Sequence, residues 1–361
     1  MIGRLNFYLI RRFALWLMIT GAGFGAIAIL GDFLEMLRFT NRVNLGAADA
    51  FYLTLLRLPL LIIDFLPFVF LFSTVFCLLR MSQAQELAVI RAAGVSVWQF
   101  LMPILAFTFI LSALIVALLE PLGTSGFKRY TAIKDELTGQ KPKFSFSTDA
   151  VWFRESSSLG NYIIRAARLD PQSANRLLDV DVLVFTEDGN LAHRLKADAA
   201  LLEKGVFSIA AARYFHSNDI PVEKTDIDLP TSLQPENLTQ SFMPAKSINI
   251  WQMPNYIARA SQTGIDVARH QVRFQSLLAL PLLLMSMVMV AACFSLPTGR
   301  MVSTGQTLGM AVLSGFVLFL FNDFIQLLGD LGSVPPFLSA WVAAVIAMLL
   351  AISYLLSTED G

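Results

Sequence analysis

Charged residues are scarce in this sequence of 361 residues. Asp, Glu, Lys and Arg make up 15% of the chain and apolar residues make up 55%, whereas soluble proteins average about 25% charged and 45–50% apolar residues. The 27 basic and 27 acidic side chains leave no formal net charge. This composition excludes an ordinary soluble enzyme, a disordered chain and a basic nucleic-acid-binding protein, so we expect no nucleic-acid partner.

The sequence also lacks the residue groups on which most catalytic and cofactor sites depend. It has three histidines, and His193, His216 and His270 are too far apart to show the spacing of a metal site. No phosphate-binding Gly-x-x-x-x-Gly-Lys-Ser/Thr loop, Gly-x-Ser-x-Gly elbow or His-Glu-x-x-His motif is present. We therefore expect no catalytic residues, no metal, no cofactor and no ATPase site in this chain.

What the sequence does contain is one soluble-looking module between two apolar flanks. Of the 54 charged residues, 35 lie between Pro121 and Gln275. Both cysteines, Cys77 and Cys293, lie in the flanks. The module therefore has no disulfide and must fold around a hydrophobic core of its own.

Six stretches are long and apolar enough to cross a bilayer, which takes about 20 residues for a core of about 30 Å. They cover residues 13–31, 58–79, 95–119, 274–299, 301–322 and 331–358. The first stretch could also be read as a cleaved signal peptide. Its apolar run continues past the small residues that would mark a cleavage site, which favours an uncleaved anchor.

Between the third and fourth stretches, short segments alternate polar and apolar residues as β-strands do. Residues 143–147, 179–182 and 225–229 show this pattern. Many short strands separated by turns favour an antiparallel sandwich or jelly roll over βαβ units. The predicted fold class is a membrane α-helical protein of six transmembrane helices, arranged 3+3, with an inserted extracytoplasmic antiparallel β-jelly-roll domain.

The chain is divided accordingly into five parts. We expect transmembrane helices 1–3 in residues 1–120, with a short cytoplasmic helix at about 82–94, a helical connector in 121–140, the β domain in 141–250, a connecting helix in 251–275, and transmembrane helices 4–6 in 276–361.

Basic residues in short loops indicate the orientation, because Lys and Arg favour the cytoplasmic side. One side of the predicted spans carries Arg4, Arg11, Arg12, Arg80, Arg91 and Arg300. The opposite loops carry Arg38, Arg42 and Arg57. The bias is modest but consistent, so we expect both termini in the cytoplasm and the β domain outside it.

The loop between the second and third spans holds the most informative segment. Residues 82–94 predict a short helix in which Leu87, Ile90 and Ala93 share one face, while Glu86 projects elsewhere and Gly94 ends the helix. Such a helix could lie in a groove of a soluble partner and transmit its movement. It could equally be an interfacial helix that only connects two spans.

Here the sequence resembles a known family. The segment Glu86-Leu87-x-x-Ile90-Arg91-Ala92-Ala93-Gly94 is similar to the coupling-helix signature of the LptF/LptG lipopolysaccharide-export permeases. The span layout also matches, as do the run from Ser261-Gln262-Thr263-Gly264 through Arg269 and Phe274 to Pro281 and, on the LptG side of the family, Gly332-Ser333-Val334-Pro335-Pro336.

The resemblance implies a role, partners and residues. It implies a permease subunit of an ABC-type exporter that pairs with the sister permease LptF, an LptB-like ATPase dimer and an LptC-like periplasmic bridge protein. ATP would be bound by the separate ATPase subunit, and the membrane would be the inner membrane. The residues implied for ATPase coupling are Glu86, Leu87, Ile90, Arg91 and Gly94.

Five basic residues are candidates for substrate binding, because Arg and Lys suit the phosphates of lipid A. By the predicted topology they lie at one membrane surface: Arg38, Arg42, Arg57, Lys128 and Arg129. The alternative is that each only reaches for the headgroups of surrounding lipid. Asp32 stands where the family suggests a cation late in the first span.

Two further features lie inside the predicted spans. Asp64 is an intramembrane carboxylate and therefore a functional candidate, although we favour simple pairing with Arg57 seven residues earlier over a proton-relay role. Small residues at four-residue spacing let helices approach closely. Two such pairs occur, usually for packing within a chain, and the family places these spans at a gate against the sister permease: Gly21, Gly25, Gly305 and Gly309.

The resemblance thus implies a permease that takes lipopolysaccharide from the outer leaflet of the inner membrane and passes it to a periplasmic bridge. Two alternatives stay open at this stage. One is a non-transporting assembly or sensor protein whose β-sandwich binds a partner. The other is a proton-coupled lipid exporter that uses Asp64.

Overall fold

The computed structural model of this chain describes residues 2–43, 45–137, 151–157, 160–169, 176–185, 191–203, 206–209, 212–215, 222–224, 227–230, 244–262, 267–296 and 304–359. The strand expected at 143–147, the first two residues of the segment expected at 225–229, and Arg300 lie outside the described residues. The chain forms two compact units. The helical unit comprises Met1–Phe127, Asn249–Trp251 and Ala268–Gly361, and the strand unit comprises Lys128–Ile248 and Gln252–Val267.

Helices α1 to α5 come before the strands. Their bounds are α1 Ile2–Arg42, α2 Ala47–Gln83, α3 Glu86–Ala92, α4 Val97–Leu114 and α5 Glu120–Leu137, with a π-helical turn, η1, at Ile115–Leu119. Helix α4, the π turn and α5 follow one another without a break in the chain. Together they form the third long apolar segment.

Helices α7 to α10 follow the strands. A short 3₁₀ turn, η2 Ala245–Ser247, precedes α7 Met253–Gln262, α8 Ala268–Ser295, α9 Thr304–Asp330 and α10 Pro336–Glu359. The helix expected over residues 251–275 is therefore divided between α7 and α8.

Within the described part of the chain, six helices are long and apolar enough to cross a membrane. This confirms the prediction of a multi-span membrane protein. Several spans are longer than expected: α1 extends to Arg42, and α9 continues past Asn322 to Asp330. Helix α9 ends where Gly332 has φ +71° and Ser333 N–H donates to the Leu328 carbonyl at 3.0 Å, the arrangement of a Schellman cap.

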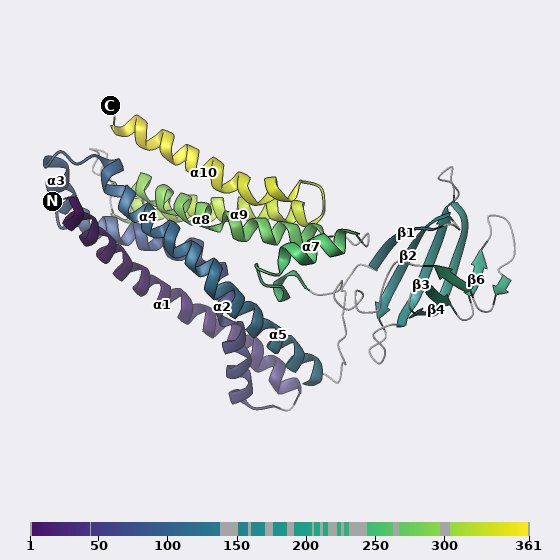
Figure 1. The fold of residues 1–361 in the computed structure, drawn as a ribbon. Helices are drawn as coiled ribbons and strands as arrows, with labels where there is room; N and C mark the ends of the chain where they lie inside the picture. Colours follow the sequence, from purple (N-terminus) through teal and green to yellow (C-terminus); the bar gives the residue numbers. More distant parts are fainter. Residues whose placement is uncertain are drawn as a thin grey trace. The chain divides into compact units, whose positions relative to one another are not determined.

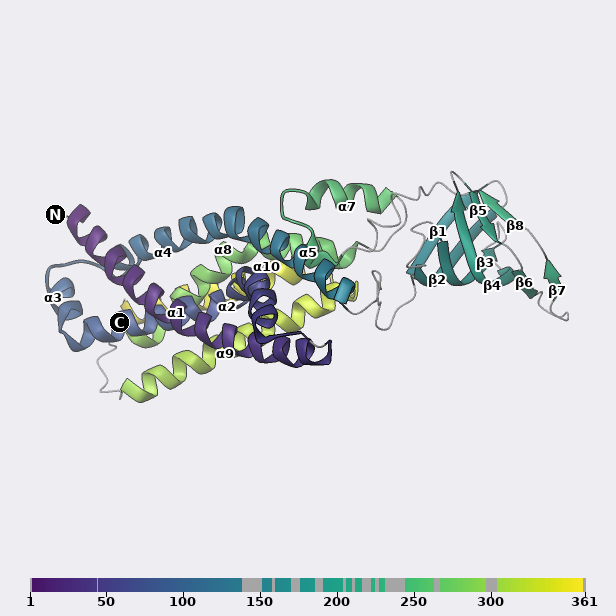
Figure 2. The same ribbon diagram turned by 90° about the horizontal axis from the view of Figure 1, so that it is seen from below.

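The core of the helical unit lies between α1, α2, α4 and α8. Phe13 of α1 and Phe70 of α2 are fully buried, and their ring centroids are 6.2 Å apart. Leu101 of α4 and Leu284 of α8 belong to the same cluster. A buried hydrogen bond between the hydroxyls of Thr20 and Ser73 also joins α1 to α2, a means of association common in membrane helices. In both views of the ribbon, α1 and α2 lie side by side (Figures 1 and 2).

The strand unit is an antiparallel sheet. Its strands are β1 Val151–Ser157, β2 Gly160–Leu169, β3 Arg176–Phe185, β4 Leu191–Glu203, β5 Val206–Ile209, β6 Ala212–Phe215, β7 Val222–Lys224 and β8 Ile227–Pro230. The order is β1-β2-β3-β4-β5-β8, with β6 pairing with both β4 and β7. The prediction of an antiparallel β domain is confirmed, and the jelly-roll topology stays a prediction.

Apolar side chains alternate along these strands, so one face of the sheet forms a hydrophobic core. This core includes Val180 and Val182 of β3 and Leu195 and Ala197 of β4. Asp181, between the two valines, points the other way and receives two hydrogen bonds from the Arg194 guanidinium, at 2.8 and 2.7 Å. Those bonds hold the pKa of the Asp181 carboxyl below its usual range.

Candidate functional site

Helix α3 is a short helix with a left-handed residue in each of its two connections. Gln85, at its N-terminal boundary, has φ 58°, and Gly94, after its C-terminal end, has φ 78°. Leu87 is buried against the helical unit and anchors α3 there. On the outward side Val89 is 68% exposed, and Ala88, Arg91 and Ala92 are exposed around it. The exposed side of α3 is therefore a small apolar surface with one cation.

Glu86 is not a free solvated residue. Its carboxylate accepts a hydrogen bond of 2.8 Å from the Tyr8 hydroxyl and lies 3.5 Å from the Arg12 guanidinium. Arg12 in turn donates to the Tyr8 oxygen at 3.3 Å. Tyr8 and Arg12 both belong to α1, so Glu86 joins α3 to the first helix. The sequence pattern placed Glu86 on a separate face from Leu87 but did not reveal this contact.

Both ends of the described chain lie close to α3. Figures 1 and 2 show the start of α1, the end of α10 and α3 at the same end of the helical unit. This is the arrangement expected when an even number of spans separates the two termini.

Arg57 differs from the other basic candidates because it is already paired. It lies 2.8 Å from Asp32, whose side chain is 4% exposed, and 3.8 Å from Glu35. Both carboxylates belong to α1, so the pair joins α1 to α2. Asp32 is thus the partner of Arg57, and its burial requires a cation nearby.

The other four basic candidates are exposed: Arg38, Arg42, Lys128 and Arg129. Arg38 and Arg42 lie at the C-terminal end of α1 in the helical unit, where no described acidic side chain forms an ion pair with either. Lys128 and Arg129 lie on the part of α5 that belongs to the strand unit. The structure therefore places two candidates, Arg38 and Arg42, together at the end of α1. Arg57, on α2, instead pairs with carboxylates of α1.

A buried charged group that residue patterns did not single out lies around Glu120, and we call it the Glu120 joint. The Glu120 side chain is fully buried. Its carboxylate accepts hydrogen bonds from Thr124 Oγ1 at 2.9 Å and from the Ile250 backbone N–H at 3.0 Å, and it pairs with Arg273 at 3.3 Å. Asp64 of α2 also interacts electrostatically with Arg273.

The π turn before Glu120 takes part in the same joint. Trp251 donates its indole N–H to the carbonyl of Ala117, inside the π turn, at 3.3 Å. A π turn shifts the backbone hydrogen-bond register and so presents carbonyls to other donors. The segment Asn249–Trp251, which returns from the strands, is thereby fixed to the third span.

A sequence signal for this joint did exist. Glu120 directly follows the expected third span and Arg273 directly precedes the expected fourth. The predicted topology puts these two span ends on the same side of the membrane. Opposite charges at such positions indicate a cross-span pair, although 153 residues separate them.

The glycines singled out by spacing do not mediate close packing within this chain. A Cβ added at Gly25, Gly305 or Gly309 would meet nothing within 4 Å, and one at Gly21 would make an ordinary contact of 3.8 Å with Val69. Close approaches within the chain occur instead at other glycines, where a Cβ would collide with a neighbouring helix: Gly123, Gly126, Gly315 and Gly329.

Helices α1 and α9, which carry the spaced glycines, are also the least covered spans. In each, 17% of the apolar window is buried, against 39% to 67% in the other four. This exposed surface faces lipid or another protein.

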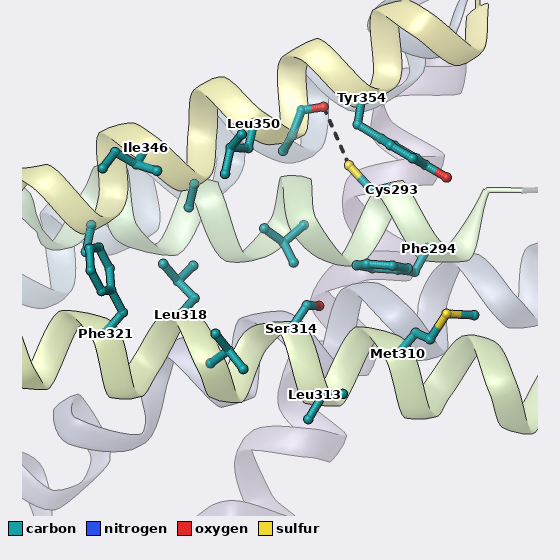
Figure 3. A pocket seen from close by; sticks show the side chains of 15 residues that line it. Cys293, Phe294, Met310, Leu313, Ser314, Leu318, Phe321, Ile346, Leu350 and Tyr354 are labelled. Atoms are coloured by element: carbon teal, nitrogen blue, oxygen red, sulfur yellow. Dashed lines mark hydrogen bonds between the residues drawn. The ribbon is translucent and has the colours of Figure 1, made fainter.

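An apolar pocket of about 710 Å³ lies among α8, α9 and α10 (Figure 3). No charged residue lines it. The Ser314 hydroxyl donates to the Ala311 carbonyl at 2.9 Å, and the Cys293 thiol donates to the Ala351 carbonyl at 3.5 Å. The pocket therefore suits hydrocarbon, because its lining is mostly apolar and the Ser314 hydroxyl and Cys293 thiol are already bonded to the protein.

Within the described residues, no three His, Cys, Asp or Glu side chains gather as metal ligands. The features that could act chemically are therefore the α3 surface, the exposed cations of α1, the Glu120 joint and the apolar surfaces.

Comparison with known proteins gives a consistent result. Residues 7–357 match the family described as lipopolysaccharide export system permease LptF/LptG. The lipopolysaccharide export system permease protein LptG of Haemophilus influenzae is 22% identical over 347 residues, which cover 93% of this chain and 92% of the relative. The protein of the same description from Escherichia coli K12 is 20% identical over 341 residues, or 89% of each chain.

The Glu120 joint predicts a double-mutant result. Glu120→Gln or Arg273→Met alone leaves a buried polar group without its charged partner, so each should destabilise the protein by about 3 kcal/mol or more, whereas Glu120→Leu with Arg273→Leu should recover most of that loss. Thermal unfolding of the detergent-purified protein measures the effect.

Glu35→Gln is the matched control, because the Glu35 side chain is 68% exposed and its pair with Arg57 is long. It should change stability by less than about 0.5 kcal/mol. If the single variants of the joint unfold at the same temperature as this control, the joint does not stabilise the helical unit.

Proposed function

Because the chain belongs to the LptF/LptG family of lipopolysaccharide export system permeases, we propose that it is the LptG-type permease subunit of an ATP-driven exporter. It is an inner-membrane, multi-pass component of a lipopolysaccharide export system. In the proposed mechanism it pairs with LptF, and an LptB-like ATPase dimer supplies the energy. The observation that carries the coupling proposal is the exposed apolar surface of α3.

The topology supports this assignment of the energy source. Helix α3 lies at the same end of the helical unit as both ends of the chain, and the basic residues of the short loops favour a cytoplasmic location for that end. A cytoplasmic ATPase would then meet Val89 and its exposed neighbours first. Leu87, buried behind them, would carry the movement into the helical unit.

The substrate is proposed to enter from the outer leaflet between this chain and LptF. Lipopolysaccharide combines phosphates with several acyl chains, so its site needs cations at the membrane surface and apolar surface below them. Arg38 and Arg42 supply exposed cations at the end of α1 opposite α3. Exposed apolar side chains of α1 and α9 supply the surface below them, as in Ile27 and Phe324.

The spaced glycines fit a seam with the sister permease. At Gly25, Gly305 and Gly309 an added Cβ would meet no described atom of a neighbouring helix within 4 Å, so a second chain has room to approach their backbone closely. Such a seam could open to admit substrate and close to expel it.

The strand unit is proposed to receive the expelled lipid. We propose that its antiparallel sheet is part of a periplasmic jelly roll, inserted between two sets of three spans, that passes lipopolysaccharide to an LptC-like bridge protein. Both termini are then cytoplasmic.

The coupling proposal is tested by Val89→Asp. This change puts a carboxylate in the centre of the exposed α3 surface while leaving buried Leu87 in place. Apolar side chains at the centre of an interface are common hot spots, so association with the ATPase should weaken about tenfold or more. Copurification and equilibrium binding of the ATPase in detergent measure it.

Leu331→Asp is the control, because Leu331 is 64% exposed, similar to Val89 at 68%, and lies in the connection between α9 and α10. It should leave ATPase binding at the wild-type level. Wild-type ATPase binding by Val89→Asp would show that α3 is not the docking surface.

The proposed substrate contacts predict that variants of the exposed and of the paired basic residues have different effects. Arg38→Gln with Arg42→Gln should reduce the preference for phosphorylated over dephosphorylated lipid A and the salt dependence of binding, with little effect on stability. Each exposed charge contributes about 1 kcal/mol or less, but charges that converge on one headgroup add. Binding of both lipids at two salt concentrations measures the preference.

Arg57→Gln should affect stability more than lipid preference. It leaves the buried Asp32 without its partner and should lower thermal stability first, by roughly 3 kcal/mol. If the α1 double variant keeps the wild-type lipid preference, Arg38 and Arg42 only anchor the helix among headgroups.

A further inference from the structure

We infer that the contact of Glu86 with Tyr8 and Arg12 carries the movement of α3 directly into α1, so that α1 acts as a lever between the ATPase and the substrate-binding end. This inference rests on the proposed function, in which an ATPase moves α3. It assigns Tyr8, Arg12 and Glu86 a positioning role that the docking surface alone does not require.

The covalent connections of α3 lead only to α2 and α4, through residues 84–85 and 93–96. Helix α1 has no chain connection to α3. The side chains of Tyr8, Arg12 and Glu86, which we call the triangle, link the two helices instead. Each of the three side chains contacts the other two, at 2.8, 3.3 and 3.5 Å. The Arg12 and Glu86 side chains are only 34% and 28% exposed, so water competes less for this pair than for a fully exposed one.

Helix α1 is suited to transmit such movement over a distance. It runs for 41 residues without a proline, which corresponds to about 60 Å at 1.5 Å per residue. In contrast, α2 contains Pro59 and Pro67, and α4 contains Pro103 and continues into a π turn. Prolines and π turns are the usual positions at which helices bend.

The packing of α1 also leaves it room to move. Only 17% of its apolar window is buried in this chain. At the end near α3 it is held by the triangle, and at the far end it carries the exposed Arg38 and Arg42 and the buried Asp32–Arg57 pair. A displacement of α3 would therefore change the position of the cations that are proposed to hold lipid phosphate.

The test uses the full reconstituted complex of this chain with its sister permease and ATPase in liposomes that contain lipopolysaccharide. Spin labels on Asn41→Cys, at the far end of α1, and on Ser333→Cys, in the connection between α9 and α10, report the position of α1. In the otherwise wild-type chain, nucleotide binding should change the distance between the labels. Arg12→Gln should reduce that change and should lower lipopolysaccharide exported per ATP hydrolysed about threefold or more.

Two variants separate transmission from general damage. Arg11→Gln removes the same charge from the neighbouring, exposed position of α1 and should couple like wild type. The charge exchange Arg12→Glu with Glu86→Arg should restore the label movement and export that each single change loses. The ion pair is then rebuilt with the carboxylate on α1 and the guanidinium on α3.

The outcomes distinguish this inference from the proposed function. If Arg12→Gln moves α1 and exports as well as Arg11→Gln, or if the charge exchange binds ATPase but restores neither readout, α1 is not driven through this triangle. If the wild-type chain binds no ATPase at all, the proposed function itself fails. Wild-type ATPase binding by Arg12→Gln, together with lost label movement, supports the lever.

Discussion

The burial of the Glu120 carboxylate is the constraint on which the arrangement of the helical unit depends. An ionised carboxylate in an apolar environment is stable only when opposite charge and hydrogen-bond donors surround it. Glu120 recruits them from three separate stretches of chain: Thr124 one turn later, the Ile250 amide after the strands, and Arg273 at the start of α8. The third and fourth spans and the returning strand connection must therefore meet at one point.

The same need for a nearby cation explains why the buried Asp32 pairs with Arg57. This pair is one of two charged links that α1 makes to other helices, and the two links have different consequences. Asp32 and Arg57 join α1 to α2 near the proposed substrate-binding end, whereas Glu86, Tyr8 and Arg12 join α1 to α3 at the other end. Helix α1 is thus held by charged contacts near both ends and by the Thr20–Ser73 hydrogen bond between them, while 17% of its apolar window is buried. In the proposed mechanism, this combination would let one helix respond to an ATPase at one end and to a charged lipid at the other.

Residue patterns were sufficient for the parts of the fold that depend on local composition. Apolar runs predicted the six long helices, alternation predicted an antiparallel β domain, and Gly94 was identified as the end of a short helix.

Contacts between distant residues were not predictable in the same way. Arg57 lies 2.8 Å from Asp32 and 3.8 Å from Glu35, carboxylates of the neighbouring helix α1 that spacing along the sequence did not indicate. The expected pairing of Arg57 with Asp64 on its own helix stays a prediction. Glycine spacing likewise indicated Gly305 and Gly309, whereas close packing within the chain occurs at Gly126 and Gly315, where helices cross.

The central claim is that lipid export by this chain is driven by nucleotide hydrolysis in a separate subunit. Transfer of lipopolysaccharide from liposomes to a soluble acceptor protein, with this chain, LptF and the ATPase reconstituted together, tests it most directly. We expect transfer that requires hydrolysable ATP and the ATPase subunit, and that is unaffected when the proton gradient is dissipated. Transfer that continues without ATP and stops when the proton gradient is dissipated would contradict it.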